Sequence, residues 1–489
     1  MGLYIPESFT EAESVTLSRH FTNLDGPVFA LINLPEVVKG ALFARYSRSP
    51  KSLRRLFLDE FADDVAAAAH QPTDAAHSAD NAERLYDKVF LEYGDDSVAQ
   101  LGGVHLACEQ ASNLLTKILE WGRLASYLEQ STRYINYDAR LGGRYRYYRD
   151  EEILASPYGT RYSELVELLT NHVRHTIKKS ISDSDFVYRQ ATRAKALDAV
   201  RGVLSASALS NVGVYGSGQA YEAMLLRMRA HPLPEAREYA DLMLVELRKV
   251  IPSFLKRVDL PDRGGKWSAY LADNHDRTAM LVDDLLGAEE PDPVPEVQLV
   301  EFDPDGEDKV VAAICFAHSH LSERQIMKRV SAMSVDEKSS LLAAYVGNRE
   351  NRRHKPGRAF ERTYYRFDVL GDYGAFRDLQ RHRLLTIEWQ RLSVEHGYVI
   401  PELVSESGGE SSFIEAMERS AALHDLLRPE FPWQASYAVS MAYRMRYVMQ
   451  FNAREAMHML ELRSSPQGHP SYRSCLLYTS PSPRDQRGS

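Results

Sequence analysis

The sequence has little that would support a secreted, membrane-spanning or disulfide-stabilised protein. Its 489 residues include only three cysteines, Cys108, Cys315 and Cys475, and this odd, sparse count provides no disulfide framework. No stretch approaches the roughly 18 consecutive apolar residues that a membrane span needs. The polar first residues, with Glu7 and Glu11, are unlike a signal peptide. We therefore expect a cytoplasmic protein.

A nucleophilic or metal centre is not evident either. Cys108 and Cys315 have no activating base near them in the sequence, so both are expected to be small core residues. His318 and His320 are two residues apart, but no carboxylate or cysteine completes a recognised ligand pattern. The sequence therefore predicts no metal site.

There is also no excess of positive charge. The formal net charge is −9 at pH 7, and 44% of the residues are hydrophobic and 26% charged. These values are ordinary for a globular protein and argue against a dedicated nucleic-acid binder. Residues 349–366 are the exception, because they combine clustered arginines with Tyr364 and Tyr365. Such a patch suits a nucleic-acid backbone, a flat anionic cofactor or a plain surface.

The length exceeds one ordinary core and predicts more than one domain. Residues 286–298 hold three prolines and four acidic residues, which predicts a linker. We expect one repeat at residues 20–285 and a second, C-terminally truncated repeat at 299–473. The low-complexity run 474–489 is a poor candidate for a packed helix and is expected to be a non-native tail.

Hydrophobic periodicity gives a coarse map of the elements. Residues 96–121 have helical spacing and predict an amphipathic helix or a helix pair. Residues 235–250 predict a long amphipathic helix, and residues 361–370 a strand. Residues 310–316 form an apolar run that fits a buried strand or a buried helical turn. The sequence therefore predicts a mixed helix and strand protein.

The two halves of the chain repeat each other. An apolar segment followed by a polar loop occurs in both, and superposing Arg123 on Arg383 sets an offset of 260 residues (383 − 123). Further on, Arg227 and Arg463 each complete a Leu-Arg pair at an offset of 236 (463 − 227). Internal repeats of this kind indicate duplicated structural units, here with connecting loops of different length.

The polar loops carry the first specific motif. Residues 123–134 read Arg-Leu-Ala-Ser-Tyr-Leu-Glu-Gln-Ser-Thr-Arg-Tyr, and residues 381–383 read Arg-His-Arg. Together they resemble the Arg-His-Arg-x-x-Ser-x-Asn-Glu-x-Ser-x-Arg-Tyr loop of the flavin-dependent thymidylate synthases. The first half has Trp121-Gly122 in place of the leading Arg-His, and the second has Arg391 in place of the serine. Each half keeps the part that the other has lost.

Two further segments extend the resemblance over most of both halves. Asn452 to Arg463 resembles the family's Asn-Ala-Arg-x-x-x-x-x-Leu-x-Leu-Arg, and residues 93–101 resemble a Gly-x-x-Ser-x-x-Glu-His segment. The histidine of that segment touches flavin in the family, but Leu101 occupies its place here. The resemblance implies an α/β (α+β) fold of two tandem repeats, each a mixed sheet covered by helices.

The resemblance also implies a chemistry and a set of ligands. The cofactor would be FAD, with NADPH and methylenetetrahydrofolate as co-substrates, and dUMP would be methylated to dTMP. The chain is expected to form a homo-oligomer, a dimer of fused pseudo-dimers. Because the flavin performs the chemistry, the protein's part is positioning and electrostatics, and no catalytic side chain is expected.

Guanidinium and hydroxyl groups suit the anionic ligands. The expected dUMP contacts are Glu129, Gln130, Ser131, Arg133, Tyr134, Arg227 and Arg463. The expected flavin contacts are Arg381, His382, Arg383, Asn452, Arg454 and His458. For Arg454 and His458 an ion-pair network on a shared helix face is an equal alternative.

Two other functions stay open. A non-catalytic paralogue that binds flavin or nucleotide is favoured by the departures at Leu101, Trp121 and Arg391. A nucleic-acid-binding protein would use residues 349–366. For the enzyme we expect one composite site, in which the first repeat holds dUMP and the second holds flavin.

Overall fold

The computed structural model describes residues 7–26, 29, 31–46, 51–69, 102–130, 132, 147–148, 185–291, 293, 295–464, 473 and 476. The chain forms two compact units that do not follow chain order. The first unit comprises Met1–Glu109, Gly122–Glu129 and Asn211–Glu289. The second comprises Gln110–Trp121, Gln130–Ser210 and Glu290–Ser489.

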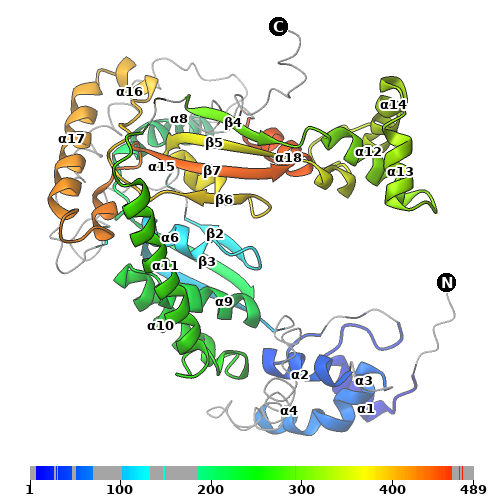
Figure 1. The fold of residues 1–489 in the computed structure, drawn as a ribbon. Coiled ribbons are helices and arrows are strands. Elements are labelled where there is room, and N and C mark those ends of the chain that lie inside the picture. Colours follow the sequence, from blue (N-terminus) through cyan, green and yellow to red (C-terminus); the bar gives the residue numbers. More distant parts are fainter. Residues whose placement is uncertain are drawn as a thin grey trace. The chain divides into compact units, whose positions relative to one another are not determined.

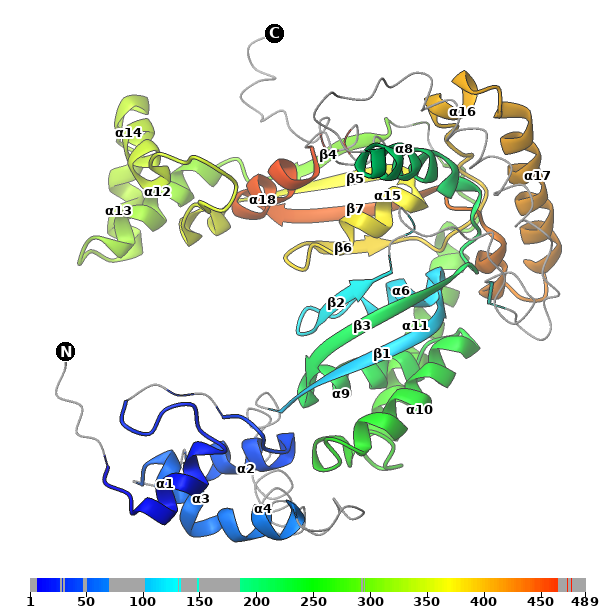
Figure 2. The ribbon, with the colours of Figure 1, turned by 180° about the vertical axis from the view of Figure 1, so that it is seen from behind.

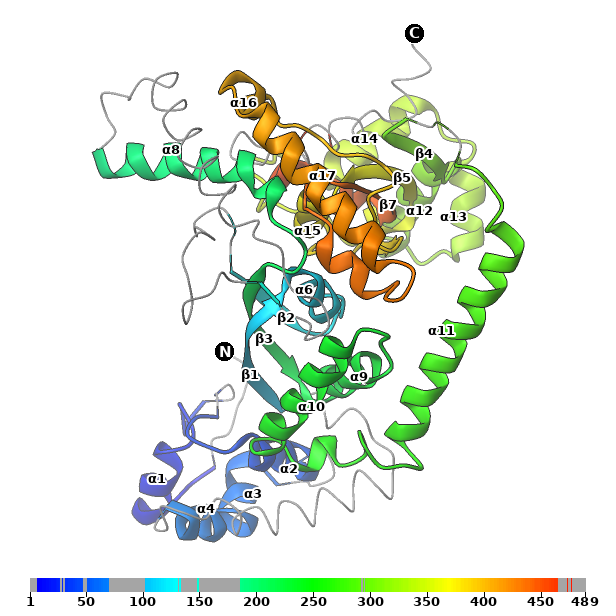
Figure 3. The same cartoon turned by 90° about the vertical axis from the view of Figure 1, so that its left-hand side faces the viewer.

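The first unit contains four N-terminal helices, most of a three-stranded sheet and three long helices that follow it (Figure 1). The N-terminal helices are α1 (Glu11–Ser18), α2 (Glu36–Tyr46), α3 (Leu53–Glu60) and α4 (Ala62–Ala69). The strands are β1 (Gly103–Ser112), β2 (Ser126–Glu129) and β3 (Leu209–Ser217), in the order β1-β3-β2. The later helices are α9 (Gly218–Arg229), α10 (Pro234–Arg248), η3 (Ser253–Leu255) and α11 (Gly264–Leu286). Figure 3 shows α11 as one uninterrupted helix.

The second unit is built on a four-stranded sheet of order β4-β5-β7-β6 (Figure 2). Its strands are β4 (Val297–Phe302), β5 (Tyr364–Asp372), β6 (Thr386–Trp389) and β7 (Arg444–Asn452), and all three pairings are antiparallel. Its helices are α6 (Asn113–Leu119), α8 (Asp185–Val200), η2 (Arg201–Val203), α12 (Gly306–Ala317), α13 (Glu323–Val330), α14 (Val335–Val346), η4 (Arg358–Arg362), α15 (Tyr373–Leu379), α16 (Glu402–Glu406), α17 (Glu410–Leu427), η5 (Gln434–Ala438) and α18 (Ala453–Arg463).

The elements confirm the predicted tandem repeat. Helix α6 and strand β2 recur as α15 and β6 at an offset of 260 residues (373 − 113 and 386 − 126). Strand β3 and helix α9 recur as β7 and α18 at an offset of 235 (444 − 209 and 453 − 218). The order β1-β3-β2 recurs as β5-β7-β6, with β4 added at the edge. The counterpart of Arg463 is therefore Met228, so the predicted pairing with Arg227 is wrong by one residue.

Alternating burial explains why β7 is a strand. Met445, Tyr447, Met449 and Phe451 are buried on one face, and the residues between them are half-buried. This period of two matches the pleat of a strand. The strand ends where the Asn452 side chain accepts a hydrogen bond from the Glu455 backbone N–H at 2.9 Å, which caps α18.

Three further segments for which the sequence predicts an element form helices or a strand. Residues 235–250 form a helix as predicted, α10, and residues 361–370 largely coincide with strand β5. The apolar run 310–316 lies within a helix, α12, whose buried face explains its composition. Within the described residues, no helix combines the length and the apolar character that crossing a bilayer needs.

The prediction for residues 96–121 is wrong, because its described part forms β1 followed by α6. The spacing of leucine and valine in this segment also fits a single helix. In the structure the helix begins only after Ser112, because the Ser112 side chain accepts a hydrogen bond from the Leu115 backbone N–H at 2.9 Å and caps α6.

Candidate functional site

The Arg-His-Arg segment, residues 381–383, is a turn. Helix α15 ends at Leu379, and residues 381–383 connect it to β6. The turn exposes Arg381 and Arg383 and buries His382, which is 6% exposed. A charged side chain therefore flanks the buried histidine on each side.

His382 lies at the centre of a buried hydrogen-bond network. Its Nδ1 is 3.0 Å from Glu455 Oε1, and Arg463 Nε donates to its Nε2 at 3.0 Å. Because a guanidinium can only donate, Nε2 accepts and Nδ1 carries the proton that is donated to Glu455. His458 completes the network, with Nδ1 3.5 Å from the other oxygen of Glu455. The turn and α18 are thereby fixed to each other.

A second cluster surrounds Asp378. Its carboxylate is paired with Arg381 and lies 3.5 Å from Arg201 Nη1, and its carbonyl oxygen accepts from Arg463 Nη2 at 3.0 Å. Burial would raise the pKa of Asp378, but Arg201, Arg381, Arg463 and Arg377 together outweigh burial and hold this pKa below its ordinary value. Four guanidinium groups around one carboxylate leave a positive excess, which suits an anionic ligand.

Arg201 is a candidate site residue that the sequence analysis missed. It is only 4% exposed, and its Nη2 has no hydrogen-bond partner among the described residues. A buried donor without a partner is costly, so a ligand oxygen at this atom would be stabilising. Arg201 belongs to no motif and is 177 residues from Asp378 in the chain, so no local signal marks it.

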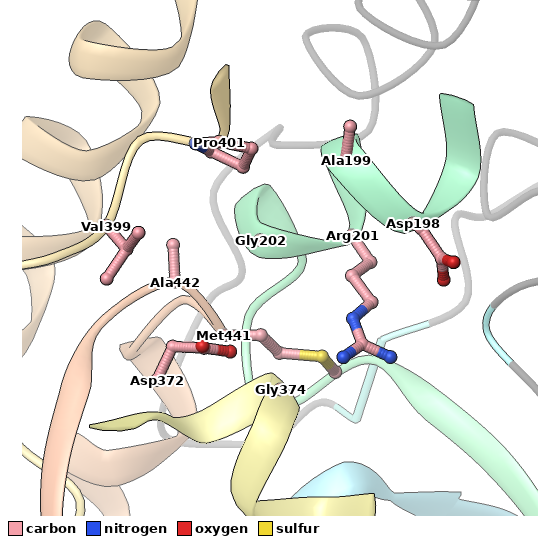
Figure 4. A pocket seen from close by; sticks show the side chains of 10 residues that line it. All are labelled: Asp198, Ala199, Arg201, Gly202, Asp372, Gly374, Val399, Pro401, Met441 and Ala442. Carbon is pink, nitrogen blue, oxygen red and sulfur yellow. The ribbon is translucent and has the colours of Figure 1, made fainter. Parts of the chain in front are cut away.

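Arg201 also lines a pocket in the second unit. Figure 4 shows the Arg201 side chain directed toward Gly374 and Met441, with Val399 and Pro401 on the opposite wall. The free space inside the pocket is about 20 Å³, roughly the room of one water molecule. The remaining lining residues are Asp198, Ala199, Gly202, Asp372 and Ala442. Most of the lining residues are apolar, and the charged ones are Arg201, Asp198 and Asp372.

Other predicted flavin contacts already have protein partners. The side chain of Asn452 caps α18. Arg454 donates to the Pro356 carbonyl at 2.9 Å and to Glu361 at 3.1 Å. These contacts favour a structural ion-pair role for Arg454, the alternative that the sequence had left open.

The predicted dUMP contacts are only partly described. Glu129, at the end of β2, is buried, and Gln130 accepts from Ser210 Oγ through its carbonyl at 3.5 Å. Ser131, Arg133 and Tyr134 lie outside the described residues. Arg227 lies in α9 of the first unit, where burial lowers its pKa to about 10.

Three of the seven lysine and arginine side chains in the basic segment 349–366 pair with acidic side chains. Arg349 pairs with Glu461 at 2.8 Å, and Arg358 pairs with Glu361 at 3.0 Å. Arg362 also pairs, with Glu323 at 2.6 Å. These pairs offset part of the positive charge that a nucleic-acid backbone would require.

His382, Glu455 and His458 offer ligand atoms that lie within 4.8 Å of one another, the spacing of a possible metal site. However, the guanidinium of Arg463 is 3.0 Å from His382 and places a positive charge beside the group. Both ring nitrogens of His382 are also engaged in hydrogen bonds. We therefore assign the three side chains to the hydrogen-bond network.

The burial of His382 should make the folding stability depend on pH. Burial lowers the pKa of His382, although Glu455 opposes the shift. The unfolded chain, with an ordinary histidine pKa of about 6.5, then binds more protons than the folded chain just below that pH. Folding stability should fall as the pH drops from about 6.5 toward the folded pKa. Urea unfolding at pH 7.5 and 5.5 measures this, and a His382→Gln variant should lose part of the difference. An identical pH dependence in the variant would contradict the prediction.

The model of a family described as "Thymidylate synthase complementing protein" matches residues 55–253 and 298–477. A UPF0159 protein of Chlamydia pneumoniae is 40% identical over 488 residues, covering 96% of this chain and 91% of that protein. A UPF0159 protein of Thermoplasma acidophilum is 31% identical, covering 88% of this chain and 89% of that protein.

Solved structures provide a weaker comparison. Two structures of the flavin-dependent thymidylate synthase of Helicobacter pylori, both with FAD and dUMP, are 21% and 20% identical to this chain. Each match covers 40% of this chain and 96% or 97% of the other, with TM-scores of 0.29 and 0.28, which are too low to assign a ligand. The family model and the full-length relatives are sufficient for the assignment: the chain belongs to the thymidylate synthase complementing protein family.

Proposed function

We propose that the chain is a flavin-dependent thymidylate synthase that methylates dUMP to dTMP. The carbon donor would be methylenetetrahydrofolate, and NADPH would reduce the bound FAD. One observation carries the proposal: Arg201 of the first repeat and Arg381 and Arg463 of the second surround Asp378. Guanidinium groups from both repeats therefore meet at one place, as a composite site for anionic ligands requires.

The residues around Asp378 fit such ligands. Arg201 has a buried, unpartnered Nη2 that a phosphate or carbonyl oxygen would satisfy. Arg463 is held by His382 and Asp378, so its guanidinium is oriented before a ligand binds. We assign dUMP to Ser131, Arg133 and these arginines, and flavin to the Arg381–Arg383 turn. Bound FAD would supply the methylene transfer and hydride chemistry, and the chain would position the reactants.

The proposal includes the organisation of the chain. Residues 20–285 and 299–473 are the two repeats, joined by the linker 286–298. The fused chain would self-associate into a dimer and act in the cytoplasm. Light scattering on the full-length protein measures the self-association. A monomer at micromolar concentration would contradict the predicted dimer.

The function is tested by separating the two ligands. Arg381→Ala should abolish flavin retention, measured by the visible absorption of the purified protein, while Arg133→Ala should retain flavin and lose dUMP binding. Arg349→Ala, which removes an exposed ion pair, is the matched control. Equal loss of flavin in the first two variants would count against the division of roles, and a colourless wild-type protein against the function.

A non-catalytic paralogue is the second candidate. It is favoured by the Trp121-Gly122 pair, which stands at the positions of Arg381 and His382 in the first repeat. Tritium release from labelled dUMP distinguishes the two candidates, because a paralogue would bind flavin without turnover. The third possibility, nucleic-acid binding, has less support, because three arginines of the basic segment pair with acids and the net charge of the chain is −9.

A further inference from the structure

Two backbone segments of the second unit pair around a local twofold axis. Ser205 forms an antiparallel bridge with Ser440. Ser440 is the residue of the second repeat that is equivalent to Ser205, at the offset of 235 residues (440 − 205). The Ala206 N–H donates to the Val439 carbonyl at 2.8 Å, and the Met441 N–H donates to the Leu204 carbonyl at 2.8 Å. The second bond is the counterpart of the first, because 206 corresponds to 441 and 204 to 439.

The symmetry extends outward from this centre. The Ser207 N–H donates to the Tyr437 carbonyl at 3.1 Å, and its counterpart is the bond from Ala442 to Gly202 at 2.9 Å. Gly202 and Tyr437 are therefore equivalent positions. Further out, Tyr148 donates to the Ser207 carbonyl and Val399 donates to the Ala442 carbonyl, so Tyr148 and Val399 are equivalent as well.

The side chains at these equivalent positions differ. On the pocket side stand Gly202 and Val399, which line the pocket beside Arg201 (Figure 4). On the other side stand Tyr437 and Tyr148, whose rings pack against each other with centroids 5.0 Å apart. Two aromatic rings therefore fill the space whose counterpart is open.

The polar groups differ in the same way. The counterpart of Arg201 is Ser436 (436 − 201 = 235), and its hydroxyl donates to the Leu392 carbonyl at 2.9 Å. Arg201 instead has a buried Nη2 with no partner among the described residues. At this pair of equivalent positions, the charged donor that a ligand can satisfy is therefore on the pocket side.

We infer that the chain keeps one of two symmetry-related ligand sites, the one beside Arg201, and that Tyr148 and Tyr437 close the other. The inference rests on the proposed function and specifies its stoichiometry. A fused pair that resembles two subunits then binds one nucleotide and one flavin per chain.

The first experiment counts ligands on the full-length protein. Equilibrium dialysis with dUMP should give one site per chain, and flavin absorbance of the saturated protein should give one FAD per chain. Two dUMP sites per chain would overturn the inference and leave the proposed function standing. No binding of either ligand would overturn both.

The second experiment exchanges the equivalent side chains. Val399→Tyr places the closing ring in the open pocket and should weaken dUMP binding at least about tenfold. The reciprocal Tyr148→Val should leave both the affinity and the count of one unchanged, because Ser436 still replaces the arginine. Unchanged dUMP affinity in a folded Val399→Tyr protein, verified by its thermal unfolding, would overturn the inference. If that variant does not fold, the wild-type count decides.

Discussion

Replacing Arg463 with methionine, the residue at the equivalent position of the first repeat, is expected to weaken dUMP binding about 100-fold, or about 2.7 kcal/mol. Arg463 donates to His382 Nε2 and to the Asp378 carbonyl. Methionine is unbranched but shorter than arginine and cannot donate, so both acceptors lose their partner and the cluster loses one positive charge. Isothermal titration calorimetry with dUMP measures the change.

Two further variants make this experiment specific. Arg463→Lys keeps the charge but loses the fork of donors, so its affinity should fall between those of the wild type and Arg463→Met. Arg349→Met removes an arginine that pairs with Glu461, a residue on the same helix as Arg463. This variant should bind dUMP as the wild type does. An Arg463→Met protein with affinity within threefold of the wild type would contradict the proposed role.

Replacing Asp378 with asparagine is expected to lower the free energy of unfolding at pH 7 by about 3–5 kcal/mol. The carboxylate is paired with Arg381 and lies 3.5 Å from Arg201, and the Asp378 side chain is 13% exposed. Without the carboxylate the surrounding guanidinium groups repel one another in a poorly hydrated place. Urea denaturation of both proteins measures the difference.

The Asp378 effect should depend on pH with a defined sign. Since the folded pKa of Asp378 lies below its ordinary value, its contribution is present above the unfolded pKa of about 3.9 and is lost as the pH falls toward the folded pKa. The difference between wild type and Asp378→Asn should therefore shrink below about pH 4. Asp241→Asn breaks an exposed ion pair with Arg229 and should cost at most about 1 kcal/mol. Equal losses in the two variants would contradict the assigned role of the cluster.

Local patterns in the sequence were sufficient for part of the fold and not for the rest. The offset of 260 residues was read from Arg123 and Arg383, and α6 and β2 repeat at that offset, whereas β3 and α9 repeat at 235. The strand β1 was misread because its apolar residues also fit a helical spacing, and only the cap at Ser112 separates strand from helix. Periodicity does not reveal where one element ends and another begins.

The same limit applies to the site. His382 could be named from its motif, but its partner Glu455 is 73 residues away and is joined to it only by the fold. Arg201 lies outside every motif, and its importance comes from burial beside Asp378, a property of packing. The roles of Ser131 and Arg133 rest on the motif alone and stay predictions.

The local twofold axis has an evolutionary consequence. In a dimer of identical subunits, each substitution near the axis enters both halves at once, so a tyrosine at the position of Gly202 would obstruct both pockets together. Covalent fusion of two copies removes this coupling, because each copy then mutates independently. At the axis itself, Ser205 pairs with Ser440, the same residue type.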